Sequence, residues 1–277
     1  IDAYVEQIPT FIDFLHSNTH LRLAPLPQFP DMYPDNPDAK MHRCHEAVPF
    51  HARALPDEEV LNLRPQHPQT ALFGLIGWTP SESLILQARG EGWLKVAISM
   101  VARYLLDIPW RFRSLRDRRL VLGGALVGAL RHSMLDRGIP LWLNSPFEDF
   151  IEEDGRVAGV LARHDGVRAR ILARKGVILA AGGFEKNNAL RQQHLEQPTD
   201  AAWTAGSPGN TGDAIAAATR ATAGHAFHGN RCGLPATAGI LTAMEARAPD
   251  YGTHALAAAM TFALAVALFA YGGSWLD

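Results

Sequence analysis

The sequence contains few cysteines and no excess of either charge. Cys44 and Cys232 are the two cysteines among 277 residues, which excludes a disulfide framework and a paired-cysteine metal site. This usage indicates a reducing compartment, and we expect a cytoplasmic protein. The 26 basic side chains are balanced by 28 acidic ones, with the two signs interspersed along the chain. That distribution argues against a protein that binds nucleic acid by neutralising phosphates.

Several sequence motifs are also missing. There is no Gly-x-Ser-x-Gly elbow of a serine hydrolase. There is no Gly-x-Gly-x-x-Gly turn of the kind that binds a dinucleotide pyrophosphate, and the glycines that begin at Gly123 have a different spacing. The first residues show no basic region followed by an apolar core, so no secretory signal is expected. Because the chain does not begin with methionine, we expect it to start inside a longer protein.

The first 120 residues are predicted to form a helical and proline-rich region that faces a substrate. Apolar residues at three- and four-residue steps predict an amphipathic helix over residues 1–15, and helical spacing returns over 92–112. Residues 24–68 are rich in proline and predict a long irregular loop, a common place for substrate contacts. The basic stretch WRFRSLRDRR, residues 110–119, predicts a solvated surface, with contact to an anionic membrane as the alternative.

Residues 121–183 have the most regular pattern of the chain. A helix is expected over residues 123–137, with Gly138 as its left-handed cap. The segment IPLWLN, residues 139–144, then predicts a short buried strand. The apolar positions that define the helix are Leu126, Leu130 and Met134.

Two aspartate-glycine pairs divide the stretch that follows. Such pairs accept the positive φ of tight hairpin turns, so Asp154-Gly155 and Asp165-Gly166 predict an antiparallel ribbon of three strands. The ribbon is followed by a predicted buried strand, residues 177–181, which ends at Gly182 and Gly183. Glycines at that point leave room for a flat cofactor against the backbone, and a tight turn without a ligand is the equal alternative.

A second glycine-bearing segment precedes an alanine-rich run. Thr211, Gly212 and Asp213 stand at the start of a predicted helix, where backbone donors and a capping side chain meet. This arrangement suits a bound ligand, and an ordinary helix cap is the alternative.

Three stretches of this region together resemble a known family. They are ALVGALRHSMLDRGIPLWLNSPFEDFIEEDGRVAGV, KGVILAAGGFEKN and AWTAGSPGNTGDAI. In order and spacing they are similar to the flavin-dependent dehydrogenases related to fumarate reductase flavoproteins, and most similar to the 3-oxosteroid 1-dehydrogenases. The earlier segment FPDMYP resembles the Pro-Asp-Tyr-Tyr-Pro segment of the steroid branch, with Met32 in place of its first tyrosine.

The resemblance implies an α/β fold, as part of a Rossmann-like FAD-binding domain with an antiparallel β ribbon and further helical segments. Residues 121–224 would belong to that domain, whereas residues 225–277 form an alanine-rich tail that matches no part of the family pattern. Tyr33 is the implied catalytic residue. FAD is the implied cofactor, and the residues implied to bind it are Phe147, Ala180, Ala181, Gly182, Gly183, Asn187, Thr211, Gly212 and Asp213.

The reaction implied by the resemblance is a desaturation next to a ketone. A base takes the proton alpha to the carbonyl while hydride passes from the adjacent carbon to the flavin. The substrate would be a small molecule, a ketosteroid. Two alternatives stay open: a fumarate-type reductase, which would need arginines that clamp carboxylates, and a non-catalytic remnant, which the missing dinucleotide turn favours.

Two further features lie outside this pattern. His42, Cys44, His45 and His51 crowd together, but their spacing fits no closed zinc site, and no bound metal is expected. Residues 255–273 carry no charge over about the length of a membrane helix. A buried alanine-rich helix is preferred there over a membrane helix, because alanine is only weakly apolar and no basic cluster flanks the segment.

Overall fold

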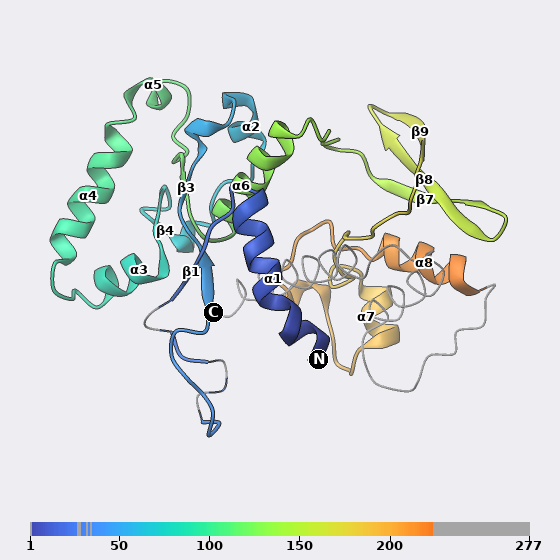
Figure 1. The fold of residues 1–277 in the computed structure, drawn as a ribbon, viewed down its shortest axis with the longest axis horizontal. Helices are drawn as coiled ribbons and strands as arrows, with labels where there is room; N and C mark the ends of the chain where they lie inside the picture. Colours follow the sequence, from blue (N-terminus) through green and yellow to red (C-terminus); the bar gives the residue numbers. More distant parts are fainter. Residues whose placement is uncertain (1, 27–28, 32, 34, 224–277) are drawn as a thin grey trace. The chain divides into compact units, whose positions relative to one another are not determined.

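The computed structural model describes residues 2–26, 29–31, 33 and 35–223. The chain divides into two compact units after Pro140 (Figure 1). They are called here the N-terminal unit, residues 2–140, and the C-terminal unit, whose described part is residues 141–223. The functional division at residue 120 that the sequence suggests stays a prediction.

The N-terminal unit alternates helices with very short strands. Its helices are α1 (Asp2–Asn18), α2 (Asp57–Asn62), α3 (Pro80–Gln87), α4 (Trp93–Leu105), α5 (Ile108–Arg111) and α6 (Leu122–Asp136). Its strands are β1 (Leu23–Pro25), β2 (His45–Ala47), β3 (Phe50–His51), β4 (Ala71–Leu72), β5 (Ile76–Gly77) and β6 (Arg119–Leu120). They form antiparallel pairs, β1 with β2, β3 with β6 and β4 with β5.

Both helices expected in the first part of the chain are confirmed. Residues 1–15 correspond to α1, and residues 92–112 correspond to α4 and α5. The helical spacing in α4 has a clear cause, because Met100 and Tyr104 are buried in a cluster with Ile76 of β5. Burial of one apolar face is what produces such a period in a surface helix.

The proline-rich stretch over residues 24–68 is less irregular than expected. It contains most of β1, all of β2 and β3, and α2. Leu23 pairs with Ala47 across the intervening loop, so the first half of the proline-rich segment is closed by the pairing of β1 with β2. Proline is tolerated here because Pro25 lies at the end of a two-stranded pair, where one side of the strand needs no partner.

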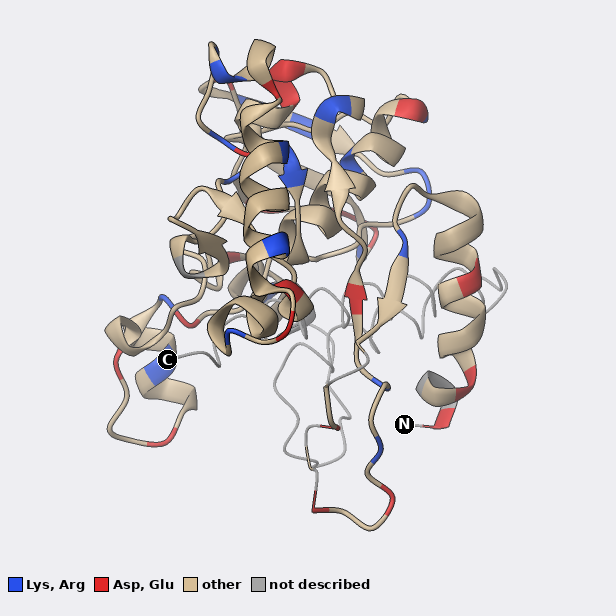
Figure 2. Ribbon diagram, turned by 90° about the vertical axis from the view of Figure 1, so that its left-hand side faces the viewer, with Lys and Arg blue, Asp and Glu red and all other residues tan. Residues whose placement is uncertain are grey.

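The basic stretch over residues 110–119 is the expected solvated surface only in part, because Arg113 is 66% exposed whereas two later arginines are largely buried. The side chains of Arg118 and Arg119 are 16% and 12% exposed. Arg118 donates to the buried carboxylate of Asp107, and Arg119 donates two hydrogen bonds of 3.0 Å to Glu82. Figure 2 shows acidic and basic positions intermixed on the ribbon. Two arginines at the end of the charge run therefore form ion pairs that tie β6 and the residue before it to α3 and to the N-cap of α5.

Helix α6 confirms the expected helix and its cap. Gly138 has φ +61°, and its N–H donates to the carbonyl of Leu135 at 3.0 Å. The buried face of α6 differs from the expected one. Leu126, Leu130 and Met134 were expected to define that face, but the most buried positions carry small side chains instead. At one of them, Gly128, a Cβ would lie 2.6 Å from Leu120 Cδ1, so a small residue lets β6 pack against the helix. The buried positions of α6 are Ala125, Gly128, Ala129 and Ser133.

The C-terminal unit contains the predicted ribbon. Strands β7 (Phe147–Glu153), β8 (Arg156–His164) and β9 (Val167–Leu172) form one antiparallel sheet in that order. Both turns have the predicted positive φ, at 52° and 70° for Asp154-Gly155 and at 50° and 79° for Asp165-Gly166. Helices α7 (Asn188–His194) and α8 (Asp213–Ala223) follow, with a short 3-10 turn (Ala201–Trp203) between them. The helix predicted after Asp213 is confirmed as α8.

Two predicted strands are wrong. Residues 139–144 form no strand and end in a turn, because Pro140 has no N–H to donate and Asn144 has φ +50°. Residues 177–181 also pair with no strand among the described residues, although alternate side chains are partly buried. Val177 and Leu179 pack against the cluster that includes Phe150, whereas the side chain of Ile178 is 68% exposed. A β-strand forms when its backbone pairs with a neighbouring strand, and no described strand pairs with residues 177–181.

No helix within the described ranges has the length and apolar character needed to cross a membrane. Residues 255–273, for which a buried helix was preferred over a membrane helix, lie outside the described residues.

Candidate functional site

A small cavity in the C-terminal unit brings together two glycine-bearing segments. Its volume is about 100 Å³. Ala181 and Gly182 come from the stretch after the ribbon, whereas Gly209 and Gly212 come from the loop before α8. Phe147, at the start of β7, completes the wall between them. The full lining is Phe147, Ala181, Gly182, Gly209, Gly212, Asp213 and Ala214.

Five of the predicted cofactor-binding residues thus line one cavity although they are far apart in sequence. They are Phe147, Ala181, Gly182, Gly212 and Asp213. Four further residues were predicted but are not in the cavity lining: Ala180, Gly183, Asn187 and Thr211. Gly209 and Ala214 line the cavity and were not predicted. The Pro-Gly pair at residues 208–209 is a turn signal that could have indicated Gly209.

The protein's own packing requires glycine at two of these positions. Gly182 has φ +81°, and a Cβ there would collide with the side-chain oxygen of Asn210. Gly212 also has φ +81°, and its Cβ would lie 2.7 Å from the Cβ of Phe184. Room for a cofactor is therefore not the sole reason for these glycines, since each also lets the two segments approach closely.

Hydrogen bonds lock the two segments to each other. The Lys186 N–H donates to the Asn210 carbonyl at 3.0 Å, and the Asn187 side chain donates to the Thr211 carbonyl at 2.9 Å. The side-chain amide of Asn210 also donates to the carboxylate of Glu185. These hydrogen bonds hold residues 185–187 and residues 210–211 together.

Asn187 connects the two segments and does not line the cavity. It is the N-cap of α7, and its side-chain oxygen accepts from the Leu190 N–H at 3.2 Å. Its side-chain nitrogen donates to Thr211, so both ends of the amide are used within the protein. The prediction that Asn187 binds the cofactor stays a prediction, since its amide nitrogen has a second N–H that these bonds do not use.

The segments at the cavity and the adjoining α7 carry two carboxylates, Asp213 and Glu185, and two cations. Asp213 lies in the first turn of α8, where a negative charge is favoured by the helix dipole, and it accepts a hydrogen bond from the Thr211 hydroxyl. Lys186 donates to the Thr204 carbonyl at 2.6 Å, and Arg191 donates to the Thr199 hydroxyl at 2.5 Å. Neither cation has a carboxylate partner among the described residues, so both leave positive charge near the site.

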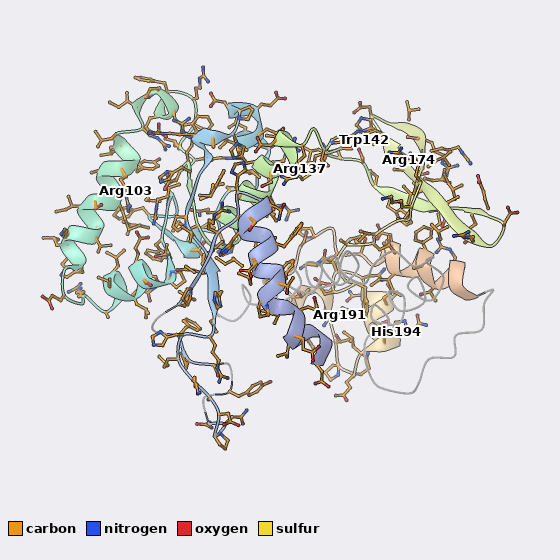
Figure 3. The ribbon with its side chains drawn as sticks, viewed as in Figure 1. Arg103, Arg137, Trp142, Arg174, Arg191 and His194 are labelled. Carbon is orange, nitrogen blue, oxygen red and sulfur yellow. The ribbon has the colours of Figure 1, made fainter. Side chains whose placement is uncertain are left out.

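Arg191 also has an unused donor. Its Nε atom is buried and has no hydrogen-bond partner within the described part of the chain. Figure 3 shows Arg191 and His194 on α7. A buried guanidinium N–H without an acceptor is costly, and no acceptor for it lies among the described residues.

The cavity fits part of a cofactor such as FAD. Its walls are backbone and small side chains with one aromatic ring, which suits a flat ring system or a sugar edge. Its volume of about 100 Å³ is well below the roughly 300 to 1,000 Å³ of complete ligand pockets. The cavity is therefore large enough for a part of such a ligand and too small for all of it.

Tyr33, the predicted catalytic residue, lies in the N-terminal unit. It belongs to the loop between β1 and β2, where its carbonyl accepts from the Asn36 N–H at 3.2 Å. Its side chain is 75% exposed. Its catalytic role stays a prediction.

The histidine and cysteine cluster of the proline-rich stretch does not come together as a metal-binding group among the described residues. His42, Cys44, His45 and His51 are distributed over a loop, β2 and β3, and Cys44 instead donates to the Pro30 carbonyl at 3.8 Å.

Comparison with known proteins matches the chain to one family over most of its length. Residues 1–230 match the model of the FAD binding domain. The chain is 32% identical over 199 residues to the 3-oxosteroid 1-dehydrogenase of Comamonas testosteroni, which covers 71% of this chain and 35% of that protein. It is 33% identical over 227 residues to the 3-oxosteroid 1-dehydrogenase of Mycobacterium tuberculosis, covering 79% of this chain and 39% of that protein.

A solved structure shows the same similarity. The crystal structure of 3-ketosteroid delta1-dehydrogenase from Sterolibacterium denitrificans in complex with 1,4-androstadiene-3,17-dione matches with a TM-score of 0.75 and 41% sequence identity. The match covers 79% of this chain and 40% of that one. The chain thus spans between 35% and 40% of the length of these relatives. The resemblance seen in the sequence is confirmed, and the chain belongs to the FAD-binding-domain family of flavoproteins, whose cofactor is FAD.

Proposed function

We propose that this chain is the FAD-binding part of a flavin-dependent dehydrogenase that desaturates a 3-oxosteroid next to its ketone. The observation that carries the proposal is the cavity in which the Ala181-Gly182 and Gly209 to Ala214 segments meet at Phe147. The relatives named as 3-oxosteroid 1-dehydrogenases support the substrate class. A ketosteroid is accordingly the small-molecule partner that we propose.

We propose that the described residues belong to a Rossmann-like FAD-binding domain. The family match over residues 1–230 supports an FAD-binding domain. In the C-terminal unit, Val177 and Leu179 pack against the core cluster that includes Phe150.

Each named residue then has a defined task. Bound FAD would supply the hydride acceptor for the reaction. Ala181, Gly182 and Gly212 would hold the cofactor against backbone, and the ring of Phe147 would exclude water from one side. Asp213 would orient a hydroxyl or amide of the cofactor through its carboxylate. Tyr33 would hold or move a proton at its phenol oxygen, which needs positive charge or hydrogen bonds nearby, because an unperturbed phenol has a pKa of about 10.

A matched pair of substitutions tests the cofactor site. Ala180 and Ala181 are adjacent and both exposed, but Ala181 lines the cavity and Ala180 does not. Ala181→Leu fills the space and should weaken FAD binding by about tenfold or more, whereas Ala180→Leu should leave it unchanged. The measurement is titration of flavin fluorescence, with the chain joined to its flanking coding sequence. Equal affinity in the two variants would count against this cavity as the FAD site.

A second measurement tests the reaction class. The same preparation is assayed for dehydrogenation of a 3-oxosteroid with an artificial electron acceptor and for reduction of fumarate with a reduced viologen. Turnover of the steroid alone supports the proposal. Fumarate reduction would replace it with a reductase, and bound FAD without either activity would indicate a non-catalytic flavoprotein. From the cysteine usage we also propose a cytoplasmic location.

A further inference from the structure

Three metal-binding side chains meet at the end of α6 in the N-terminal unit. His132 and Asp136 are one helical turn apart on α6, and His20 lies in the segment that follows α1. His20 Nε2 is 2.5 Å from Asp136 Oδ2, and His132 Nε2 is 3.8 Å from Asp136 Oδ1. One ligand atom from each residue lies within 4.8 Å of the others. This is the distance range in which a single ion can be shared.

The backbone on both sides of the cluster is fixed by hydrogen bonds. The His20 N–H donates to the Ser133 hydroxyl at 2.8 Å, and that hydroxyl donates to the Ala129 carbonyl at 2.8 Å. Arg137, labelled in Figure 3, donates to the Asn18 carbonyl and so ties the end of α1 to the end of α6. The positions of the two elements are thus set by contacts that do not use the imidazoles or the carboxylate.

The cluster has the composition and exposure of a transition-metal site. Two imidazole nitrogens and one carboxylate oxygen suit Zn²⁺ and its neighbours, whereas Ca²⁺ and Mg²⁺ take oxygen ligands. The side chains of His20 and Asp136 are 41% and 52% exposed, and that of His132 is 22% exposed, so an ion and a water molecule can reach all three. Asp136 forms no ion pair with lysine or arginine among the described residues, which leaves its charge available.

We propose that His20, His132 and Asp136 bind a divalent transition metal, with Zn²⁺ as the best fit and water as the fourth ligand. In the structure the two imidazole rings are stacked, with centroids 3.9 Å apart and planes 17° apart, so their nitrogens do not yet converge. His132 also packs against Phe50 at 6.0 Å, whereas His20 is the more exposed ring. Rotation of the His20 ring out of the stack would direct its Nε2 toward the ion.

This metal would have a structural task that is separate from the FAD site. It would join the segment after α1 to the last turn of α6, and both elements belong to the N-terminal unit. Metal–ligand bonds of about 2.0 to 2.2 Å would replace the hydrogen bond between His20 and Asp136. Binding would therefore stabilise the folded N-terminal unit, because the unfolded chain does not hold the three ligands together.

The test is titration of the full chain with Zn²⁺, and with Co²⁺ as a visible probe of four-coordinate geometry. We expect one bound ion per chain. Asp136→Asn and His132→Asn should each weaken Zn²⁺ binding by about tenfold or more. His45→Asn changes an exposed histidine of the same unit outside the cluster and should leave the affinity unchanged. Equal Zn²⁺ affinity in the wild-type and Asp136→Asn chains would overturn the proposal.

A stability measurement keeps the test decisive if one variant folds poorly. Asp136 is exposed, so Asp136→Asn should preserve the fold even if His132→Asn does not. Added Zn²⁺ should raise the melting temperature of the wild-type and His45→Asn chains but not that of Asp136→Asn. A rise of the same size in all three chains would place the bound metal elsewhere and contradict the proposal.

Discussion

The side-chain amide of Asn187 donates to the Thr211 carbonyl across 2.9 Å and so joins the two segments that line the cavity. The same amide accepts from the Leu190 N–H and caps α7. Asn187 therefore positions both α7 and the loop before α8 that lines the cavity.

Asn187 offers a way to separate these two tasks. Asn187→Ala removes both bonds and should lower the free energy of unfolding by about 1 to 2 kcal/mol through loss of the cap alone. Asn187→Asp keeps an acceptor for Leu190 but cannot donate to Thr211, so it should retain the cap and still weaken FAD binding. Thermal unfolding and flavin titration of both variants are the measurements. If Asn187→Asp bound FAD as tightly as the wild type, the bond to Thr211 would have no part in the site.

Substitution at Gly182 should destabilise the protein without any cofactor. Gly182 has φ +81° and lies against Asn210, so Gly182→Ala should cost about 1 to 3 kcal/mol in strain and collision. Gly176→Ala is the matched control, since a Cβ at Gly176 has no atom within 4 Å. Urea unfolding of the FAD-free chain measures both. Adding Asn210→Gly to the Gly182→Ala variant should restore the part of the unfolding free energy that was lost through the collision with Asn210. If nothing is restored, the whole loss comes from the strained backbone at residue 182.

Asp107 should be important for the stability of the N-terminal unit. Its side chain is 7% exposed and accepts hydrogen bonds from Arg118 and Arg53. Asp107→Asn removes the nearest counter-charge of the Arg118 guanidinium, leaving the more distant carboxylate of Asp57 at 3.7 Å, and should cost about 3 kcal/mol. Arg53→Met removes a partner that is 60% exposed and should cost at most about 1 kcal/mol. Similar losses in the two variants would show that burial does not set the strength of these pairs.

The same ion pair predicts a dependence of stability on pH. Hydrogen bonds from Arg118 hold the pKa of Asp107 below its usual range. A carboxylate with a lowered pKa contributes its stability above the unfolded-state value of about 3.9 and loses it as the pH falls further. Unfolding measured from pH 7 down to pH 3 should therefore show a steeper loss for the wild type than for Asp107→Asn. Parallel curves would mean that Asp107 has the same pKa in the folded and unfolded chains.

Tyr33 is the predicted acid-base residue. Tyr33→Phe keeps the ring and removes only the hydroxyl, so turnover of a 3-oxosteroid should fall by about a hundredfold or more when the chain is joined to its flanking sequence. Because the side chain is 75% exposed, the substitution should not change the melting temperature. Unchanged turnover would leave Tyr33 as a loop residue without a chemical task.

Local patterns in the sequence predicted the parts of the fold that depend on local contacts. The ribbon follows from Asp154-Gly155 and Asp165-Gly166, whose positive φ the turns require. The end of α6 follows from Gly138 for the same kind of reason. Five lining residues of the cavity could be named because the family resemblance covers the segments that carry them.

The features that were missed depend on contacts between distant residues. Arg118 appeared to be one charge in a solvated run, because its buried partner Asp107 is not recognisable as such from the sequence. His20 and His132 are stacked although more than a hundred positions separate them, and no periodicity links them. The strand expected over residues 177–181 was inferred from its apolar content and from the family resemblance, but a strand also needs a neighbouring strand to pair with.

That missing neighbour has a consequence for handling the isolated polypeptide. Residues 177–181 present backbone donors and acceptors that no described strand uses, beside an apolar side chain that is 68% exposed at Ile178. Such an unprotected edge is a template on which a second molecule can add its own copy of the same segment. We therefore expect the chain to aggregate with rising concentration when produced alone. Ile178→Lys should suppress the light scattering that reports this self-association, because a charge on the open edge opposes stacking of like molecules.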